Sequence, residues 1–322
     1  MIRKSSVTVF LCMLFVSGAA VTTGTARARS INDAIGKTSF TWLKSVADAG
    51  ISATGDCLGA RDGASGLLVH PAAVAGITGG TAKMSYVAHY VDTQYGSVGY
   101  AGKFRDRSIG IRLTYVNYGE FARTNKLGER TGTFTAGDMG FTVNLGKQVR
   151  EDLKIGAAAS FLTSRLEDFT AQAVTADMGI IYYPPFEGLT VGAALTNLGK
   201  VTKSYSSGYS EALPVTLTIG ARKKLVHSPF TIMADVIFPN DNDITYALGV
   251  EASILDRLFL YAGTKSRNDI DVEAARAETD YAGFTTFGLG IVLDRYRFNY
   301  AFCPDDVLNE DVHKVTLGVT VR

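Results

Sequence analysis

Apolar and polar residues alternate, segment after segment, along the chain from Thr81 to Arg322. The C-terminal segment is typical: one parity carries Val315, Leu317, Val319 and Val321, and the other carries Lys314, Thr316, Gly318 and Thr320. Successive side chains of a strand point to opposite faces, so each segment is predicted to be a strand with one apolar and one polar face. We count about fourteen such segments of about ten to twelve residues, the length at which a tilted strand crosses a bilayer. The pattern predicts an all-β, transmembrane antiparallel β-barrel of about fourteen strands.

The predicted connections alternate between short and long. The short links are Phe104 to Arg107, Val149 to Asp152, Tyr183 to Gly188, Leu225 to Pro229, Ile254 to Arg257 and Leu293 to Arg295. The long links are Gly119 to Gly137, Leu166 to Ala173, Gly199 to Pro214, Thr264 to Gly283 and Phe302 to Val312. Tight periplasmic turns and longer outer loops are typical of bacterial outer-membrane barrels. The first link, Val91 to Thr93, is short and departs from this rule.

Residues 1–28 have the features of a signal peptide. Arg3 and Lys4 precede an apolar stretch from Val7 to Val16, and Ala26-Arg27-Ala28 offers a cleavage site. Ten apolar residues are too few to span a membrane, so export is expected.

Composition excludes some classes of partner. Lys and Arg total 32 against 31 Asp and Glu, so no global charge favours nucleic acid. The 34 glycines and 7 prolines suit long strands with tight corners. Of the 3 cysteines, only Cys57 and Cys303 follow the signal peptide. Outside the cytosol they could form one disulfide, or remain two free thiols.

Residues 29–80 do not alternate. We expect a short helix from Phe40 to Ala49, followed by a Gly/Ala-rich run with Asp62-Gly63-Ala64-Ser65-Gly66 and His70-Pro71-Ala72-Ala73-Val74-Ala75 at its centre. This order resembles the motif that precedes the first strand in FadL-like outer-membrane proteins and their PorV/PorQ-type relatives. The matching residues are Asp62, Ala64, Ser65, Pro71, Ala72 and Ala75, and Gly55, Gly59, Ala60 and Arg61 resemble the small-residue run before it.

The resemblance covers nearly the whole mature chain but has departures. His70 stands where Asn is usual, Ala73 where Gly is usual, and the chain ends in Arg322 rather than an aromatic residue. The resemblance implies that residues 29–80 fold inside the lumen of a fourteen-stranded barrel, residues 81–322, as a plug or hatch. A barrel of this size encloses more space than its own side chains fill, which makes a hatch physically reasonable. The alternative is a periplasmic tail or a disordered leader.

Several ionisable residues occupy the polar positions of the strands, so their side chains are expected to point into the lumen. The candidate lumen charges are Arg112, Asp177, Arg222, Asp235, Glu251 and Arg297, with Lys83, His89, Asp138, Arg295 and Lys314 on the same parity. A basic side chain facing lipid would cost about 2–4 kcal/mol at the midplane. These residues could line a polar conduit or a carboxylate-binding spot, or they could pair with one another or with the hatch.

No catalytic, cofactor or metal signature stands out. The chain has no C-x-x-C, H-E-x-x-H or G-x-S-x-G, and His70, His89, His227 and His313 lack metal-ligand spacing. A non-enzymatic protein without a cofactor is therefore expected.

The resemblance implies a channel of the bacterial outer membrane for long-chain fatty acids or other hydrophobic small molecules. Candidate residues of the hatch and ligand path are Trp42, Asp62, Ser65, His70, Pro71 and Ala72. The expected partners are outer-membrane lipid, a hydrophobic small-molecule ligand and the barrel assembly machinery. Two alternatives remain: a PorV/PorQ-type component that docks secreted proteins in type IX export, and a structural or adhesin-like barrel.

Overall fold

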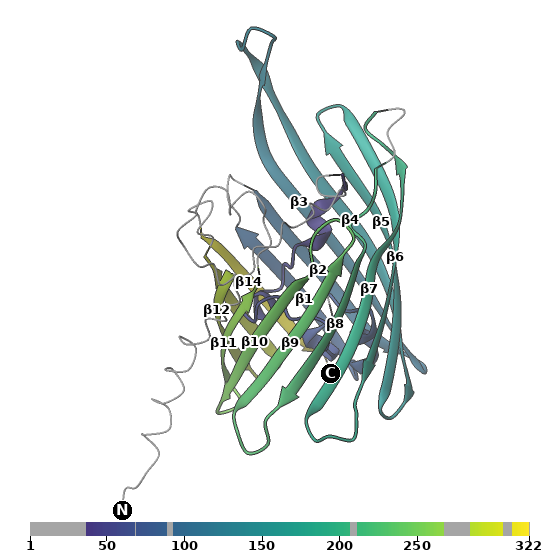
Figure 1. Ribbon diagram of the computed structural model, residues 1–322, viewed down its shortest axis with the longest axis vertical. Coiled ribbons are helices and arrows are strands. Elements are labelled where there is room, and N and C mark those ends of the chain that lie inside the picture. Colours follow the sequence, from purple (N-terminus) through teal and green to yellow (C-terminus); the bar gives the residue numbers. More distant parts are fainter. Residues whose placement is uncertain are drawn as a thin grey trace, which may run out of the picture. The chain divides into compact units, whose positions relative to one another are not determined.

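The computed structural model describes residues 37–67, 69–88, 93–206, 211–266, 284–304 and 311–321. Within these ranges, fourteen antiparallel strands form one closed barrel (Figure 1). Each strand pairs with the next along the chain, and β1 pairs with β14 to close the barrel, with Gly80 opposite Val321. The predicted fold class is confirmed. The expected signal peptide, His89 and Arg322 lie outside the described residues.

The strands run in simple up-and-down order. Their bounds are β1 Gly80–Ala88, β2 Gln94–Phe104, β3 Arg107–Thr124, β4 Arg130–Arg150, β5 Leu153–Leu166, β6 Phe169–Tyr182, β7 Leu189–Lys203, β8 Thr216–Lys224, β9 Phe230–Pro239, β10 Thr245–Ile254, β11 Leu258–Lys265, β12 Phe284–Leu293, β13 Tyr296–Cys303 and β14 Val312–Val321.

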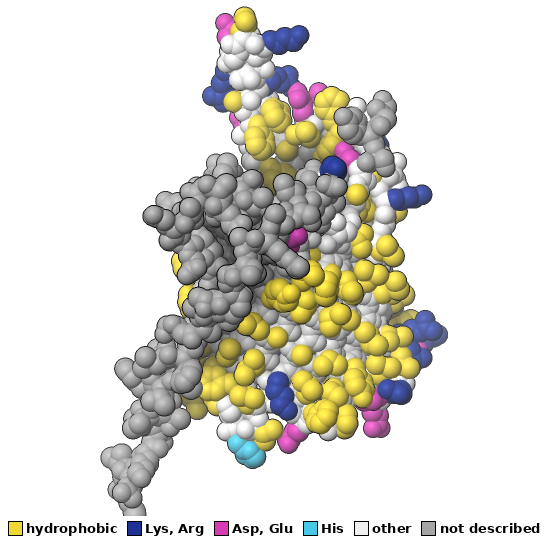
Figure 2. All heavy atoms as spheres, viewed as in Figure 1, with side chains coloured by type: hydrophobic (Ala, Val, Ile, Leu, Met, Phe, Trp, Pro, Cys, Tyr) yellow, Lys and Arg dark blue, Asp and Glu magenta, His cyan; other side chains and the backbone are white. Residues whose placement is uncertain are grey.

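The two faces of the strands differ as the alternation predicts. In β14, Leu317 is 43% exposed on the outer face, while the neighbouring Thr316 is 1% exposed on the inner face. Figure 2 shows hydrophobic side chains across the outside of the strands, with charged side chains gathered mostly toward the two ends. An apolar outer band and a polar interior are the arrangement of a transmembrane barrel.

All six short links are found where the sequence predicts them, but two of the long links are not loops. β3 continues to Thr124 and β4 begins at Arg130, so most of the segment from Gly119 to Gly137 is a projecting β-hairpin (Figure 1). The segment from Leu166 to Ala173 is also strand, because β5 and β6 are joined only by residues 167–168. In the β3–β4 hairpin both faces are exposed, so alternation is lost. At the start of β6 the inner face is instead apolar, because Ala171 and Ala173 are buried against the hatch near Trp42. The other three long links, and the first link, lie partly outside the described residues.

The described part of the N-terminal segment, residues 37–67 and 69–79, lies inside the barrel, and we call it the hatch. It contains four short helical turns, η1 Thr41–Lys44, α2 Ala49–Ser52, η2 Gly63–Ser65 and η3 Pro71–Gly76. The single helix expected from Phe40 to Ala49 is wrong, because Ser45 has extended backbone angles and α2 begins only at Ala49. Among the described residues, no helix combines the length and apolar character needed to cross a membrane.

Glycines on the inner face of the wall let the hatch backbone come close. A Cβ on Gly192 would lie 2.1 Å from the Gly59 oxygen, and one on Gly263 would lie 2.1 Å from the Gly55 nitrogen. No side chain could occupy these positions without moving the hatch. The inward glycines therefore position the hatch, with η3 against β3 to β6 and α2 against β12 to β14.

Candidate functional site

The hatch separates two cavities in the lumen. The short-turn end of the barrel carries the two-residue links 105–106, 151–152 and 294–295, and the hairpin end carries the β3–β4 hairpin. The outer cavity, on the hairpin side, has a volume of about 640 Å³. The inner cavity, on the short-turn side, has a volume of about 320 Å³. Asp48 of the hatch lines both.

One part of the outer cavity is apolar. It is lined there by Trp42, Leu43, Val46, Val87, Tyr95 and Val312. Trp42 is 8% exposed and packs with Val116, Leu162 and Leu213, while its ring meets Tyr95 edge-on at 6.4 Å. The indole therefore forms a rigid wall of the cavity rather than a mobile cover.

Another part of the outer cavity is polar. It is lined by Arg112, Thr114, Thr142, Asn144, Asp177, Thr196, Asn197, Thr216 and Thr218. Arg112 donates to the Thr142 hydroxyl at 3.3 Å. The lining of the outer cavity is therefore amphipathic rather than entirely apolar.

The polar wall includes an irregularity between β6 and β7. The register shifts between Ala176 and Met178, and Asn197 has a positive φ of 62°. The Asp177 carboxylate accepts the Asn197 backbone N–H at 2.7 Å, a donor that the bulge removes from the strand ladder. Asp177 thus both bonds to the backbone at the bulge and lines the outer cavity.

A row of hydrogen-bonded charges connects α2 to β11 and β14 at the outer cavity. The Asp56 carboxylate forms an ion pair with Lys265 at 3.2 Å and accepts from the Ser52 hydroxyl at 3.0 Å. Lys314 donates to the same hydroxyl at 2.8 Å and to the Val46 carbonyl at 2.9 Å. Burial alone would raise the pKa of Asp56, but the two lysines outweigh it and lower the pKa, so the carboxylate stays charged.

His70 and Pro71 form a buried turn of the hatch beside the outer cavity. The His70 side chain is 1% exposed, and its Nδ1 accepts the Ala72 N–H at 3.2 Å at the start of η3. Burial lowers the pKa of His70 to about 4, against smaller opposing effects of the Ala193 carbonyl and Asp62. The ring is therefore neutral at neutral pH and serves as the cap that Asn would otherwise supply.

Asp62 and Ser65 face the inner cavity. Asp62 accepts the Gly63 N–H at 2.7 Å as the cap of η2, and it also bonds Lys154 of β5 and the Tyr183 hydroxyl. Ser65 donates to the Asp62 carbonyl at 2.7 Å. The first half of the family-like motif thus ties the hatch to the wall at the short-turn end.

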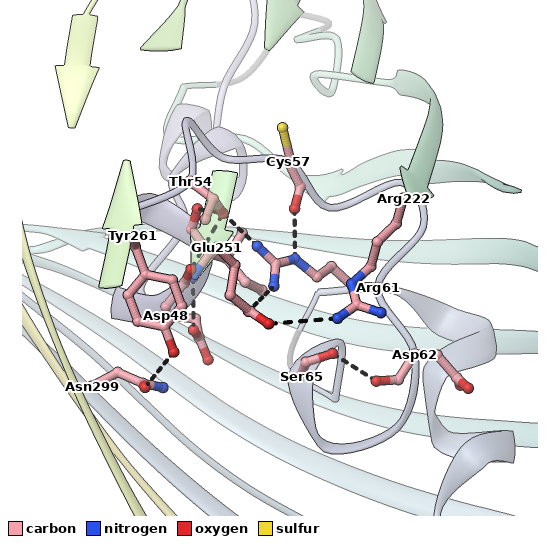
Figure 3. A network of polar contacts seen from close by, with 12 residues as sticks. Asp48, Thr54, Cys57, Arg61, Asp62, Ser65, Arg222, Glu251, Tyr261 and Asn299 are labelled. Carbon is pink, nitrogen blue, oxygen red and sulfur yellow. Dashed lines mark hydrogen bonds and ion pairs between the residues drawn. The ribbon is translucent and has the colours of Figure 1, made fainter. Parts of the chain in front are cut away.

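A second polar network lies beside the inner cavity (Figure 3). Arg61 of the hatch donates to the Cys57 carbonyl at 2.9 Å and to Thr54, and it faces Glu251 at 3.9 Å. Glu251 also faces Arg222 at 3.6 Å. Three separate segments, the hatch, β8 and β10, meet at this carboxylate.

The structure divides the candidate residues between the two cavities. Trp42, His70, Pro71, Arg112 and Asp177 line the outer cavity, and Asp62, Ser65, Arg222, Glu251 and Arg297 line the inner one. Ala72 and Asp235 line neither. Ala72 packs against the wall beside Gly156, and Asp235 accepts the Leu58 and Gly59 N–H groups, each at 2.7 Å. Arg295 is in an exposed turn beside Tyr296 rather than in the lumen.

The alternative that lumen charges pair with the hatch is confirmed, but the hatch partners were not identified from the sequence. Asp48 pairs with Lys83 of β1, Asp56 with Lys265, and Arg61 with Glu251. The glycines at inward positions of the strand interiors were an available signal, because they indicate where another backbone approaches closely. The alternation of apolar and polar residues predicts which side chains point inward, but it does not predict which hatch residue pairs with which wall residue.

Cys57 and Cys303, the cysteines within the described residues, are free thiols, and Cys57 is buried. Burial, with the nearby Asp235 carboxylate, raises the pKa of the Cys57 thiol well above its usual range. In the described ranges, no three His, Cys, Asp or Glu side chains are grouped so that they could hold a metal ion.

Comparison with known proteins identifies the fold. No family model and no curated protein matches the chain. The crystal structure of the P. putida toluene transporter TodX is similar with a TM-score of 0.61 at 13% identity, over 85% of this chain and 98% of that one. The monoaromatic hydrocarbon channel CymD gives a TM-score of 0.58 at 10% identity, over 86% and 98%. The chain therefore has the fold of these barrel channels, and the FadL-like or PorV/PorQ-type resemblance remains a prediction.

Proposed function

We propose that the protein is a non-enzymatic channel of the bacterial outer membrane for the uptake of hydrophobic small molecules. The observation that carries this proposal is the outer cavity of about 640 Å³, held between the hatch and the wall at the hairpin end. Small-molecule sites commonly enclose about 300–1,000 Å³. The toluene transporter and the hydrocarbon channel with the same fold support the proposal.

The route follows from the arrangement of the lumen. A ligand enters at the hairpin end, binds in the outer cavity and stops at the hatch. The hatch is tied to the wall by ion pairs on several sides, so passage requires that some of these contacts break or that the wall opens. In this proposal the apolar outer band lies in the lipid and the short turns lie on the periplasmic side, as is usual for such barrels.

The lining favours an amphipathic ligand, such as a long-chain fatty acid. The surface near Trp42 and Tyr95 suits an apolar chain, whereas the threonines and Arg112 suit a polar head. A pure hydrocarbon could use only the apolar part of this lining, whereas an amphipathic ligand could use both parts.

A cavity-filling pair of variants tests the proposal. Ala158 is 8% exposed and lines the outer cavity, whereas the neighbouring Ala157 is on the exposed outer face of β5. In liposomes, the unmodified protein and A157F should accelerate entry of labelled oleate, and A158F should lose most of the effect. Folded protein, verified by heat-modifiable gel mobility, that neither binds nor moves oleate or toluene would rule out the function. If the protein moves toluene but not oleate, the proposed ligand is a neutral hydrocarbon and not a fatty acid.

The β3–β4 hairpin supports a second candidate function, the docking of secreted proteins. Phe121 and Phe134 stack at 5.4 Å on the projecting part, and Leu127 near its tip is 83% exposed. An ordered projection that exposes Phe121 and Leu127 beside charged residues suits contact with another protein. Deleting residues 121–134 should leave oleate entry unchanged and abolish export of the docked protein; unchanged export would remove this candidate.

A further inference from the structure

The inner cavity holds an excess of guanidinium groups. Arg61, Arg222 and Arg297 all line it, and the charges of Arg61 and Arg297 both act on Arg222. Glu251 is the one carboxylate among the described residues that forms ion pairs with this group, facing Arg61 at 3.9 Å and Arg222 at 3.6 Å. Three positive charges therefore meet one negative charge.

The other charges around the cavity compensate one another. Asp48 forms an ion pair with Lys83, with both side chains buried. Asp62 is occupied by Lys154 and by the Tyr183 hydroxyl. Neither aspartate is therefore available to neutralise the arginines.

Arg222 and Arg297 each have guanidinium N–H groups that lack a hydrogen-bond acceptor among the described residues. Within the described residues, Arg222 has only the Glu251 contact, which at 3.6 Å is longer than a hydrogen bond, and its side chain is 31% exposed. Arg297 is oriented by the Asn299 side chain, which accepts from its Nε at 3.4 Å, by the Tyr261 hydroxyl at 2.8 Å and by the Phe259 ring at 4.2 Å, so that one of its terminal nitrogens remains unbonded among the described residues. Arg61 has its Nε and one terminal nitrogen bonded within the hatch, and its other terminal nitrogen faces Glu251.

We propose that the inner cavity is an oxyanion-binding site, in which Arg222 and Arg297 take a carboxylate or phosphate group. A planar guanidinium presents paired N–H donors that match both groups, and the oriented Arg297 adds little ordering cost. The anion supplies negative charge that the wall and hatch lack at this point. The site does not depend on the ligand of the outer cavity and lies on the opposite side of the hatch.

Binding to detergent-solubilised full-length protein tests the site. Calorimetric titrations with inorganic phosphate, acetate and octanoate should give saturable binding of at least one oxyanion. R222Q should weaken it about tenfold, and R222Q/R297Q should abolish it, because each arginine contributes charge-assisted hydrogen bonds. E251Q should tighten it by removing the competing carboxylate. R295Q, in an exposed turn at the same end, is the matched control and should change nothing.

The probes separate the sources of the oxyanion. Binding of phosphate or acetate identifies a free anion, and binding of octanoate alone identifies the head of an amphiphile. No saturable binding, or equal binding by the unmodified protein and a folded R222Q/R297Q variant, would overturn the site. Phosphate binding needs no hydrophobic uptake, so this result and the oleate experiment can fail independently.

Discussion

Gly156 of β5 lies directly against the carbonyl of Pro71 in the hatch, so that a Cβ on Gly156 would come within 2.1 Å of that oxygen. We expect G156A to displace η3 from the wall, because both partners are backbone or rigid and cannot turn aside. Limited proteolysis of the folded barrel should then cut the hatch faster. G318A is the matched control, since a Cβ on this inward glycine of β14 meets its nearest atom only at 3.8 Å. A hatch as resistant in G156A as in G318A would contradict the close packing.

Cys57 should report release of the hatch. Its thiol is 2% exposed, and burial raises its pKa, so both access and thiolate formation are suppressed. In a C303A background, a maleimide at pH 7.5 should label Cys57 far more slowly than a cysteine introduced at the exposed Leu127, as read by mass spectrometry. G156A should raise the Cys57 rate, and similar rates for Cys57 and L127C in the unmodified hatch would contradict its burial.

The ion pair of Asp48 with Lys83 should stabilise the seated hatch. Its side chains are 2% and 7% exposed, so K83M leaves a buried carboxylate without its partner. Breaking a buried pair on one side typically costs about 3–5 kcal/mol. We expect a lower urea midpoint for loss of hatch protection in K83M. The double variant K83M/D48N should recover much of it, because Asn can still cap α2; no recovery would mean that Lys83 acts through packing alone.

His70 should make stability depend on pH. Its folded pKa is lowered to about 4, whereas an unperturbed histidine has a pKa near 6.5. Between these values the unfolded chain binds the proton more readily, so stability falls as the pH drops from about 6.5 to about 4, by up to about 3 kcal/mol.

H70N provides the control for this titration. Asn retains a cap at the start of η3 and does not titrate. Urea midpoints measured across this pH range should therefore fall less steeply in H70N than in the unmodified protein. Parallel curves for the two proteins would show that the acid sensitivity arises from other groups.

The membrane-facing part of the fold could be predicted because lipid imposes a strict rule on alternate residues. Leu317 and Thr316 could not exchange faces without placing a polar group in lipid and an apolar one inside. This requirement for alternation does not apply beyond the bilayer, where Phe121 and Thr131 are both exposed. The β3–β4 hairpin therefore carries no alternation signal and was expected to be a loop.

The candidate site was less predictable for a different reason. Parity showed that Glu251 and Arg222 point inward, but not that Arg61 of the hatch would meet them. Such contacts depend on how a non-repetitive segment folds within a closed wall. The motif residues Asp62 and His70 were recognisable, yet the structure assigns them to different cavities, a separation of which their spacing gives no sign.

The complete set of contacts that holds the hatch depends on closure of the barrel. They come from wall residues far apart along the chain: Lys83 in β1, Lys154 in β5, Asp235 in β9, Glu251 in β10, Lys265 in β11 and Lys314 in β14. These groups surround one space only after β14 has paired with β1. The segment that precedes every strand in the sequence therefore has its full set of contacts only in the closed barrel.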